Sequence, residues 1–103
     1  MSKKDKKRLE VYKYSNPNIV FDKANKVFNN YNFDIDISTR KNKKYMIRGD
    51  FTEGEWVHFG QMGYEDFTKH NDEIRQDKFH KRNNSWIERP INSPAFLSYV
   101  LLW

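Results

Sequence analysis

The stretch VHFGQMGYEDFTKH, residues 57–70, holds the side chains that could most readily do chemistry. His58, Asp66 and His70 could serve as general bases or metal ligands, because imidazole and carboxylate groups both transfer protons and bind divalent metals. A small metal-assisted nuclease would need these three side chains to converge on one ion. The histidines of the chain, at positions 58, 70 and 80, are spaced by 12 and 10 residues. Neither interval is a recognised chelating spacing.

Other catalytic arrangements find no support in the sequence. The chain has no cysteine, which excludes disulfides, thiolate zinc sites and cysteine nucleophiles. Gly60 and Gly63 are not followed by the Gly-Lys-Ser/Thr of a phosphate-binding loop, and no serine elbow is present. We therefore interpret residues 57–70 as a turn between a strand and a helix, in which the glycines adopt backbone conformations that are unfavourable for other residues. We expect a protein that is not an enzyme, with no metal and no cofactor.

The two halves of the chain carry opposite net charge. Residues 1–48 contain 13 Lys and Arg against 5 Asp and Glu, a net charge of +8. Residues 49–103 contain 6 against 9, a net charge of −3. This asymmetry predicts a polyanionic partner for the first half and a different partner for the second.

Two segments concentrate the positive charge. Residues 1–14 are expected to form a flexible basic arm, because dense like charges repel one another. Residues 40–44, RKNKK, form a second basic run. Both could lie along phosphates, with release of counterions. The residues expected to bind nucleic acid are Lys3, Lys4, Lys6, Lys7, Arg8, Arg40, Lys41, Lys43 and Lys44. Tyr12, Tyr14 and Tyr45 could stack on unpaired bases, although for Tyr45 a place in the core is favoured.

Residues 15–103 are predicted to form one α+β domain. A first helix begins near Pro17, with Ser15 or Asn16 as its cap. Its apolar stripe is expected in the core: Val20, Ala24, Val27, Phe28 and Tyr31. Alternating residues 33–38 predict a strand, and residues 44–59 predict a central β-hairpin with its loop at Glu53 and Gly54.

Two further helices are expected after the hairpin. One begins between residues 66 and 72, where several side chains could cap it, and ends at Asn83 and Asn84. The other has Ser93 as its cap and is apolar to its end. The predicted fold is therefore a small antiparallel sheet of about three strands packed with three helices. Four residues are expected to bind a partner: Arg75, Phe79, Arg82 and Trp103.

Residues 43–103 carry a pattern of fixed spacings. It consists of a Lys-Tyr hairpin, a His-Phe-Gly, a Gly-Tyr-x-Asp-Phe-Thr-x-His-x-Asp run, an Arg-x-x-x-Phe-x-x-Arg helix and a final Leu-Leu-Trp. On this chain those positions are Lys44, Tyr45, His58, Phe59, Gly60, Gly63, Tyr64, Asp66, Phe67, Thr68, His70, Asp72, Arg75, Phe79, Arg82, Leu101, Leu102 and Trp103. The pattern resembles a small basic domain of unknown function from large double-stranded DNA viruses of the phycodnavirus and mimivirus type, which also occurs in some phages.

The resemblance implies a virus-encoded basic adaptor module and brings no catalytic residues with it. The leading hypothesis is a non-enzymatic virion protein, present in the host cytoplasm or nucleus during assembly. Its C-terminal half would dock to other viral structural proteins, and its basic half would contact viral DNA or RNA or another acidic surface. A minor capsid or cement protein that binds no nucleic acid is the second hypothesis, and the metal-assisted nuclease is the third. No apolar run approaches the roughly 20 residues of a membrane span.

Overall fold

The computed structural model describes residues 1–103 as three strands, five α-helices and two short 3₁₀ helices. The elements in chain order are α1 (Lys3–Tyr12), α2 (Pro17–Val27), β1 (Phe33–Ile37), β2 (Lys43–Gly49), η1 (Asp50–Thr52), β3 (Val57–Gln61), α3 (Phe67–His70), α4 (Glu73–Arg82), η2 (Asn84–Glu88) and α5 (Pro94–Leu101). The α+β class predicted from the sequence is confirmed.

The sheet is antiparallel, with the order β1-β2-β3. Strand β2 is central, and its Tyr45 lies opposite Ile37 on β1 and opposite Phe59 on β3. The hairpin loop lies where it was predicted, since Glu53 and Gly54 have φ values of 55° and 79°. These left-handed conformations reverse the chain between β2 and β3.

Five α-helices are present where three were predicted. The helix expected between residues 66 and 83 is divided into α3 and α4 by Asn71, whose φ is 55°. Asp66 caps α3, and Asp72 caps α4. Asparagine tolerates the left-handed conformation better than most residues, and a helix cannot continue through it.

The additional helix, α1, forms within the segment expected to be a flexible arm. Ser2 caps it by accepting a hydrogen bond from the backbone N–H of Asp5. Its last turn carries Val11, which is fully buried. The composition of this segment indicated mobility. The buried Val11 and the Ser2 cap both favour a helix instead.

The core lies between the sheet and the helices α2 and α5. Val20, Ala24 and Phe28 of the predicted helical stripe are fully buried. Two members of that stripe were wrongly placed in the core, because Val27 is 43% exposed and Tyr31 is 42% exposed. They lie at the end of α2 and just beyond it, where no element covers them fully.

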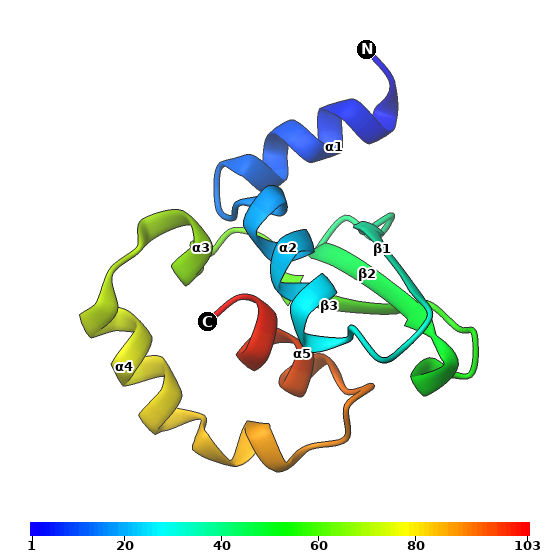
Figure 1. The fold of residues 1–103 in the computed structure, drawn as a ribbon. Coiled ribbons are helices and arrows are strands. Elements are labelled where there is room, and N and C mark those ends of the chain that lie inside the picture. Colours follow the sequence, from blue (N-terminus) through cyan, green and yellow to red (C-terminus); the bar gives the residue numbers. More distant parts are fainter.

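Figure 1 shows how the remaining elements surround this core. Helices α3 and α4 and the segment after them form an arc to one side of the sheet, which then returns to α5. The end of α5 lies inside this arc. None of the helices combines the length and apolar character that crossing a bilayer would require.

Candidate functional site

A cavity of about 530 Å³ lies between α4, the end of α5 and the segment that follows β3. Its volume falls within the range of roughly 300–1,000 Å³ that is typical of ligand sites. The residues that line it are Lys44, Gly60, Gln61, Tyr64, Glu65, Arg75, Lys78, Phe79, Arg82, Trp86, Ser98, Leu102 and Trp103. Cationic and aromatic side chains dominate this lining.

The cationic wall is one face of α4. Arg75, Lys78 and Arg82 are spaced by three and four residues, which places them on the same side of the helix. All three are exposed, and none of them forms an ion pair in the structure. The ion pair that α4 does contain joins Lys81 to Asp77, and neither residue lines the cavity.

The aromatic wall is built from α4, η2 and the end of the chain. The rings of Phe79 and Trp103 are stacked, with centroids 4.3 Å apart and planes 5° apart. Trp86 meets Phe79 edge-on, with centroids 5.6 Å apart. Gln76 Nε2 donates a hydrogen bond of 2.6 Å to the carbonyl oxygen of Trp103. This bond ties the end of the chain to α4 and holds the stack together.

The structure brings the four expected partner-binding residues into this one cavity: Arg75, Phe79, Arg82 and Trp103. Sequence reasoning missed Lys78, although it is three residues after Arg75 on the same helical face. It also missed Trp86 and Tyr64, which lie in η2 and in an irregular segment, where no periodicity could indicate their direction.

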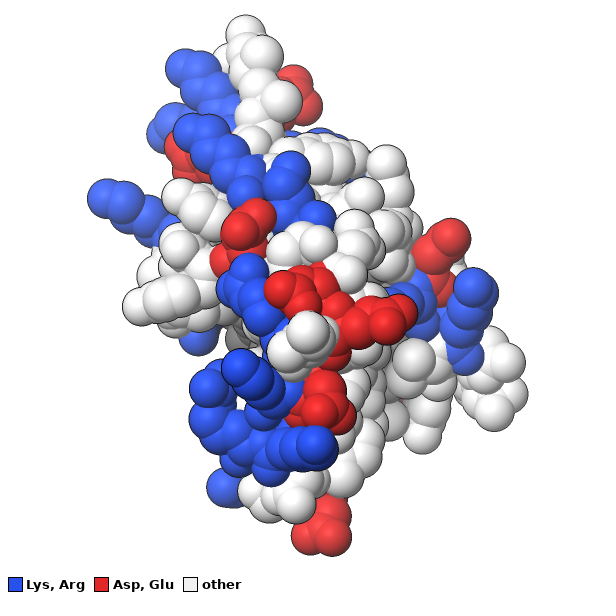
Figure 2. Space-filling view, turned by 90° about the vertical axis from the view of Figure 1, so that its left-hand side faces the viewer, with Lys and Arg blue, Asp and Glu red and all other residues white.

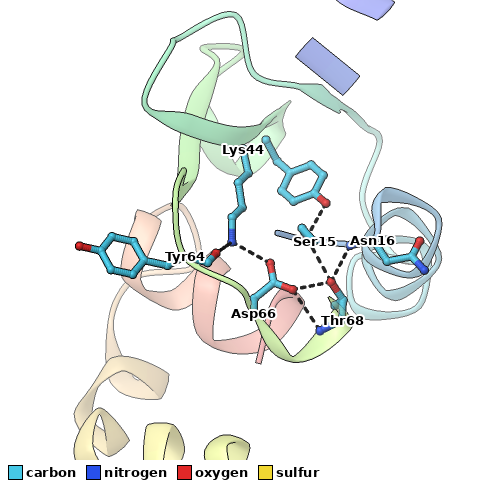
Figure 3. Close-up of polar contacts among 7 residues, drawn as sticks. Ser15, Asn16, Lys44, Tyr64, Asp66 and Thr68 are labelled. Atoms are coloured by element: carbon cyan, nitrogen blue, oxygen red, sulfur yellow. Dashed lines mark hydrogen bonds and ion pairs between the residues drawn. The ribbon is translucent and has the colours of Figure 1, made fainter. Parts of the chain in front are cut away.

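A buried polar network lies behind the cavity (Figure 3). Lys44 Nζ donates to the carbonyl oxygen of Tyr64 at 2.6 Å and to Asp66 Oδ2 at 3.1 Å. Asp66 also accepts hydrogen bonds from the backbone N–H and the hydroxyl of Thr68. The Thr68 and Ser15 hydroxyls are 3.1 Å apart, and Tyr45 donates to Ser15 at 2.6 Å. The network joins the segment between α1 and α2 to β2 and α3 across the core.

The prediction that Lys44 contacts nucleic acid is corrected by this geometry. Its side chain is 3% exposed and lies in a buried ion pair with Asp66. Burial lowers the pKa of Lys44, and the neighbouring Asp66 carboxylate opposes that shift. Tyr45 is fully buried, and burial raises the pKa of its hydroxyl group. Its preferred place in the core is confirmed, and it is not free to stack on a base.

Some of the other basic residues expected to bind nucleic acid form contacts within the chain, and the rest form no ion pair. Lys7 Nζ donates to the carbonyl oxygens of Ser38 and Arg40, at 3.0 and 2.6 Å. Lys4 Nζ is 2.6 Å from Asp36 Oδ2. Arg8 Nη2 lies 3.5 Å from Asn18 Oδ1, and its guanidinium lies over the rings of Tyr12 and Phe21. Of the nine residues expected to bind nucleic acid, those that are exposed and form no ion pair are Lys3, Lys6, Arg40 and Lys41. Lys43 also forms no ion pair and is half-buried.

Figure 2 shows how charge is distributed over the side of the molecule where α1 and α4 lie. Lys and Arg side chains gather at the top, over α1, and again in the lower part, over α4. Asp and Glu side chains lie between the two groups. Basic side chains on this side are therefore concentrated over α1 and over α4, with a mixture of acidic and basic side chains between them.

The three residues of the nuclease hypothesis occupy different environments. His58 Nδ1 lies 2.6 Å from the hydroxyl of Ser38, and Asp66 is paired with Lys44. His70 Nδ1 accepts a hydrogen bond from the backbone N–H of Asp72. No group of three or more His, Asp or Glu side chains in residues 1–103 is arranged to hold a metal ion. The convergence that the nuclease hypothesis requires is not formed.

The chain is similar to a family of unknown function (DUF5754) over residues 33–83. The matched residues run from β1 to the end of α4, so they include the sheet, Asp66 and the cationic wall of the cavity. They do not include α1 or the two tryptophans of the aromatic wall. Comparisons with curated proteins and with solved structures gave no match.

Proposed function

We propose that this protein is a non-enzymatic basic adaptor. The face formed by α1 and the turn between β1 and β2 contacts nucleic acid, and the cavity beside α4 docks another protein. The observation that carries the proposal is the pair of hydrogen bonds from Lys7 to the Ser38 and Arg40 carbonyls. They join two basic segments that are far apart in the sequence. We take the residues of these two segments that form no ion pair as one basic face: Lys3, Lys6, Arg40, Lys41 and Lys43.

Two residues of this basic face, Arg40 and Lys43, act together with Lys7 at His58. Burial lowers the pKa of His58, and the positive charges of Arg40, Lys7 and Lys43 lower it further. Three cations thus raise the electrostatic potential at one point of the surface. A region of this kind attracts phosphate groups without reading the base sequence.

The proposal places the adaptor in the particle of a large double-stranded DNA virus. It is supported by the resemblance of residues 43–103 to a basic domain of such viruses. The host cytoplasm or nucleus is then its location during assembly, and its partners are viral DNA or RNA together with other viral structural proteins.

Nucleic-acid binding is tested with a labelled DNA duplex and a labelled single strand, at low and at physiological salt. We expect binding to weaken steeply with salt, because each neutralised phosphate releases counterions. Changing Lys3, Lys41 and Lys43 together to glutamine is expected to weaken binding about tenfold and to reduce the salt dependence. The matched control changes Lys26, Lys69 and Lys81 to glutamine, which are exposed lysines outside the basic face.

The comparison of the two triple variants decides the proposal, since both remove the same charge. If both lose affinity equally, net charge alone drives binding and the basic face is not the site. If the unaltered chain binds neither DNA at low salt, the nucleic-acid part of the proposal is wrong. That result would favour a capsid or cement protein.

A further inference from the structure

We propose that the cavity beside α4 binds an acidic segment of a partner protein that carries one large apolar side chain. The inference rests on the docking part of the proposed function and names the chemistry of the partner. It is independent of the basic face on α1. Two properties of the cavity carry it: an unpaired row of cations and an apolar wall next to that row.

The row of cations is suited to several carboxylates in succession. Arg75 and Arg82 are seven residues apart on α4, which is about 10 Å along a helix axis. An extended peptide covers this distance with about three residues, at roughly 3.3 Å each. Arginine binds carboxylates with two parallel hydrogen bonds, and Arg75, Lys78 and Arg82 have no ion-pair partner within the chain.

The charge of the cavity is complementary to such a segment. Glu65 is the one acidic residue in the lining, against the three unpaired cations of α4. Lys44 also borders the cavity, but its charge is balanced by Asp66 in the buried network. The net positive lining favours an anionic ligand and disfavours a basic one.

The apolar wall is better suited to a side chain than to a base. Phe79 and Trp103 cover one face of each other, and His70 lies against Trp103 with ring centroids 5.2 Å apart. Single-stranded nucleic acid binds by stacking bases on free ring faces, which this arrangement limits. Ring edges, together with Trp86 and Leu102, instead form a surface for an apolar anchor.

The residue types of the cavity also favour a protein ligand. Trp, Tyr and Arg are the residues that most often dominate the binding energy of protein interfaces. The cavity contains two of the three tryptophans of the chain, the tyrosine Tyr64, which is 70% exposed, and two arginines. Clusters of arginine are a known mode of recognising acidic motifs.

The test uses four synthetic nine-residue peptides with Leu, Met, Phe or Tyr at the centre and Asp and Glu at all other positions. Binding is followed by NMR through the indole N–H signals of the three tryptophans. We expect at least one peptide to shift the signals of Trp86 and Trp103 and to leave that of Trp56, which is outside the cavity, unchanged. A peptide with Ala at its centre and one with lysine in place of the acids serve as ligand controls.

The variant R75Q/R82Q is expected to weaken binding of that peptide by about tenfold or more, because two charge-assisted contacts are lost. Lys81→Gln removes one exposed charge on the same helix outside the cavity and serves as a control, and it is expected to change the affinity less than about twofold. Both variants alter exposed side chains, so the fold should be retained.

Three results would overturn the inference. The first is that none of the four peptides binds at about 1 mM. The second is that the Ala-centred peptide binds as tightly as the peptides with a large central side chain. The third is that R75Q/R82Q binds the peptide as tightly as the unaltered chain. A single-stranded oligonucleotide that shifts Trp86 and Trp103 would assign the cavity to nucleic acid instead. Because DNA binding to the basic face is measured separately, failure of the peptide test leaves that part of the proposed function unaffected.

Discussion

Lys44 has neighbours in sequence that suggest one role and neighbours in space that give it another. It ends the run RKNKK, yet its ammonium group lies against the Tyr64 carbonyl and the Asp66 carboxylate inside the protein. Arg40 and Lys41 of the same run are exposed. The positive charge of Lys44 is therefore paired inside the protein, where it joins β2 to the segment before α3.

Replacing Asp66 with alanine is expected to lower the free energy of unfolding by about 3–5 kcal/mol. The change leaves the Lys44 ammonium buried without a counter-charge, and it also removes the cap of α3. The measurement is urea unfolding followed by circular dichroism. Asp66→Asn retains a capping side chain and so isolates the loss of charge.

The control for this prediction is Asp77→Ala. Asp77 pairs with Lys81 on the exposed side of α4, and such a pair contributes about 1 kcal/mol or less. If Asp66→Ala costs no more than Asp77→Ala, the buried ion pair is not a major source of stability.

At the scale of elements, two glycines shape the end of β3 and the segment that follows it. Gly60 and Gly63 have φ values of 83° and 93°, as expected for residues that turn the chain where other residues would be strained. Their surroundings differ. A Cβ atom on Gly60 would lie 2.9 Å from Leu102 Cδ1 and 3.2 Å from Lys44 Cβ, whereas one on Gly63 would meet nothing within 4 Å.

Gly60→Ala is therefore expected to destabilise the protein more than Gly63→Ala, by about 1–3 kcal/mol. Both variants incur the cost of a positive φ, but only the first brings a methyl group against the side chains of Leu102 and Lys44. Thermal or urea unfolding of the two single variants measures the difference. Equal stability would mean that the end of α5 shifts freely, and the close packing of Leu102 on β3 would then be unimportant.

For the whole molecule, the fold separates two basic regions that a linear count of charge does not distinguish. The first is formed by α1 and the turn between β1 and β2, and the second by the exposed face of α4. Acidic side chains lie between α1 and α4 on the face that Figure 2 shows. This separation is what allows two different partners in the proposed function.

The stability of the whole molecule is expected to depend on pH through His58 and His70. Burial and nearby positive charge lower the pKa values of His58 and His70 from their ordinary value of 6.5. Below pH 6.5 the unfolded chain therefore binds more protons than the folded one. The free energy of unfolding should therefore decrease as the pH is lowered. The decrease should stop once the pH is below the lowered pKa values of the folded protein.

This dependence can be measured by urea unfolding at about pH 7.5, 6.5 and 5.5. His70→Asn keeps an acceptor for the Asp72 N–H but cannot be protonated, so the decrease should be smaller in that variant. An identical decrease in the variant and the unaltered chain would show that His70 does not contribute.

The sequence by itself determined the features that depend on neighbouring residues. Period-two alternation and the Glu53-Gly54 loop were enough to predict the hairpin. Ser93 was predicted as the cap of α5, and Asn16 was one of the two caps predicted for α2. The spacing of Arg75, Phe79 and Arg82 likewise placed them on one helical face. Caps, turns and periodicity act over a few residues, so they can be read directly from the chain.

Only the tertiary structure decided which charges are free and which are buried. Lys44 is buried because Asp66, 22 residues later, lies beside it. Helix α1 is held against the sheet by bonds from Lys7 to backbone groups 31 and 33 residues away. Trp86 and Trp103 face one cavity because η2 returns the chain to α5. Desolvation and long-range pairing depend on the positions of distant segments, and no local pattern encodes those positions.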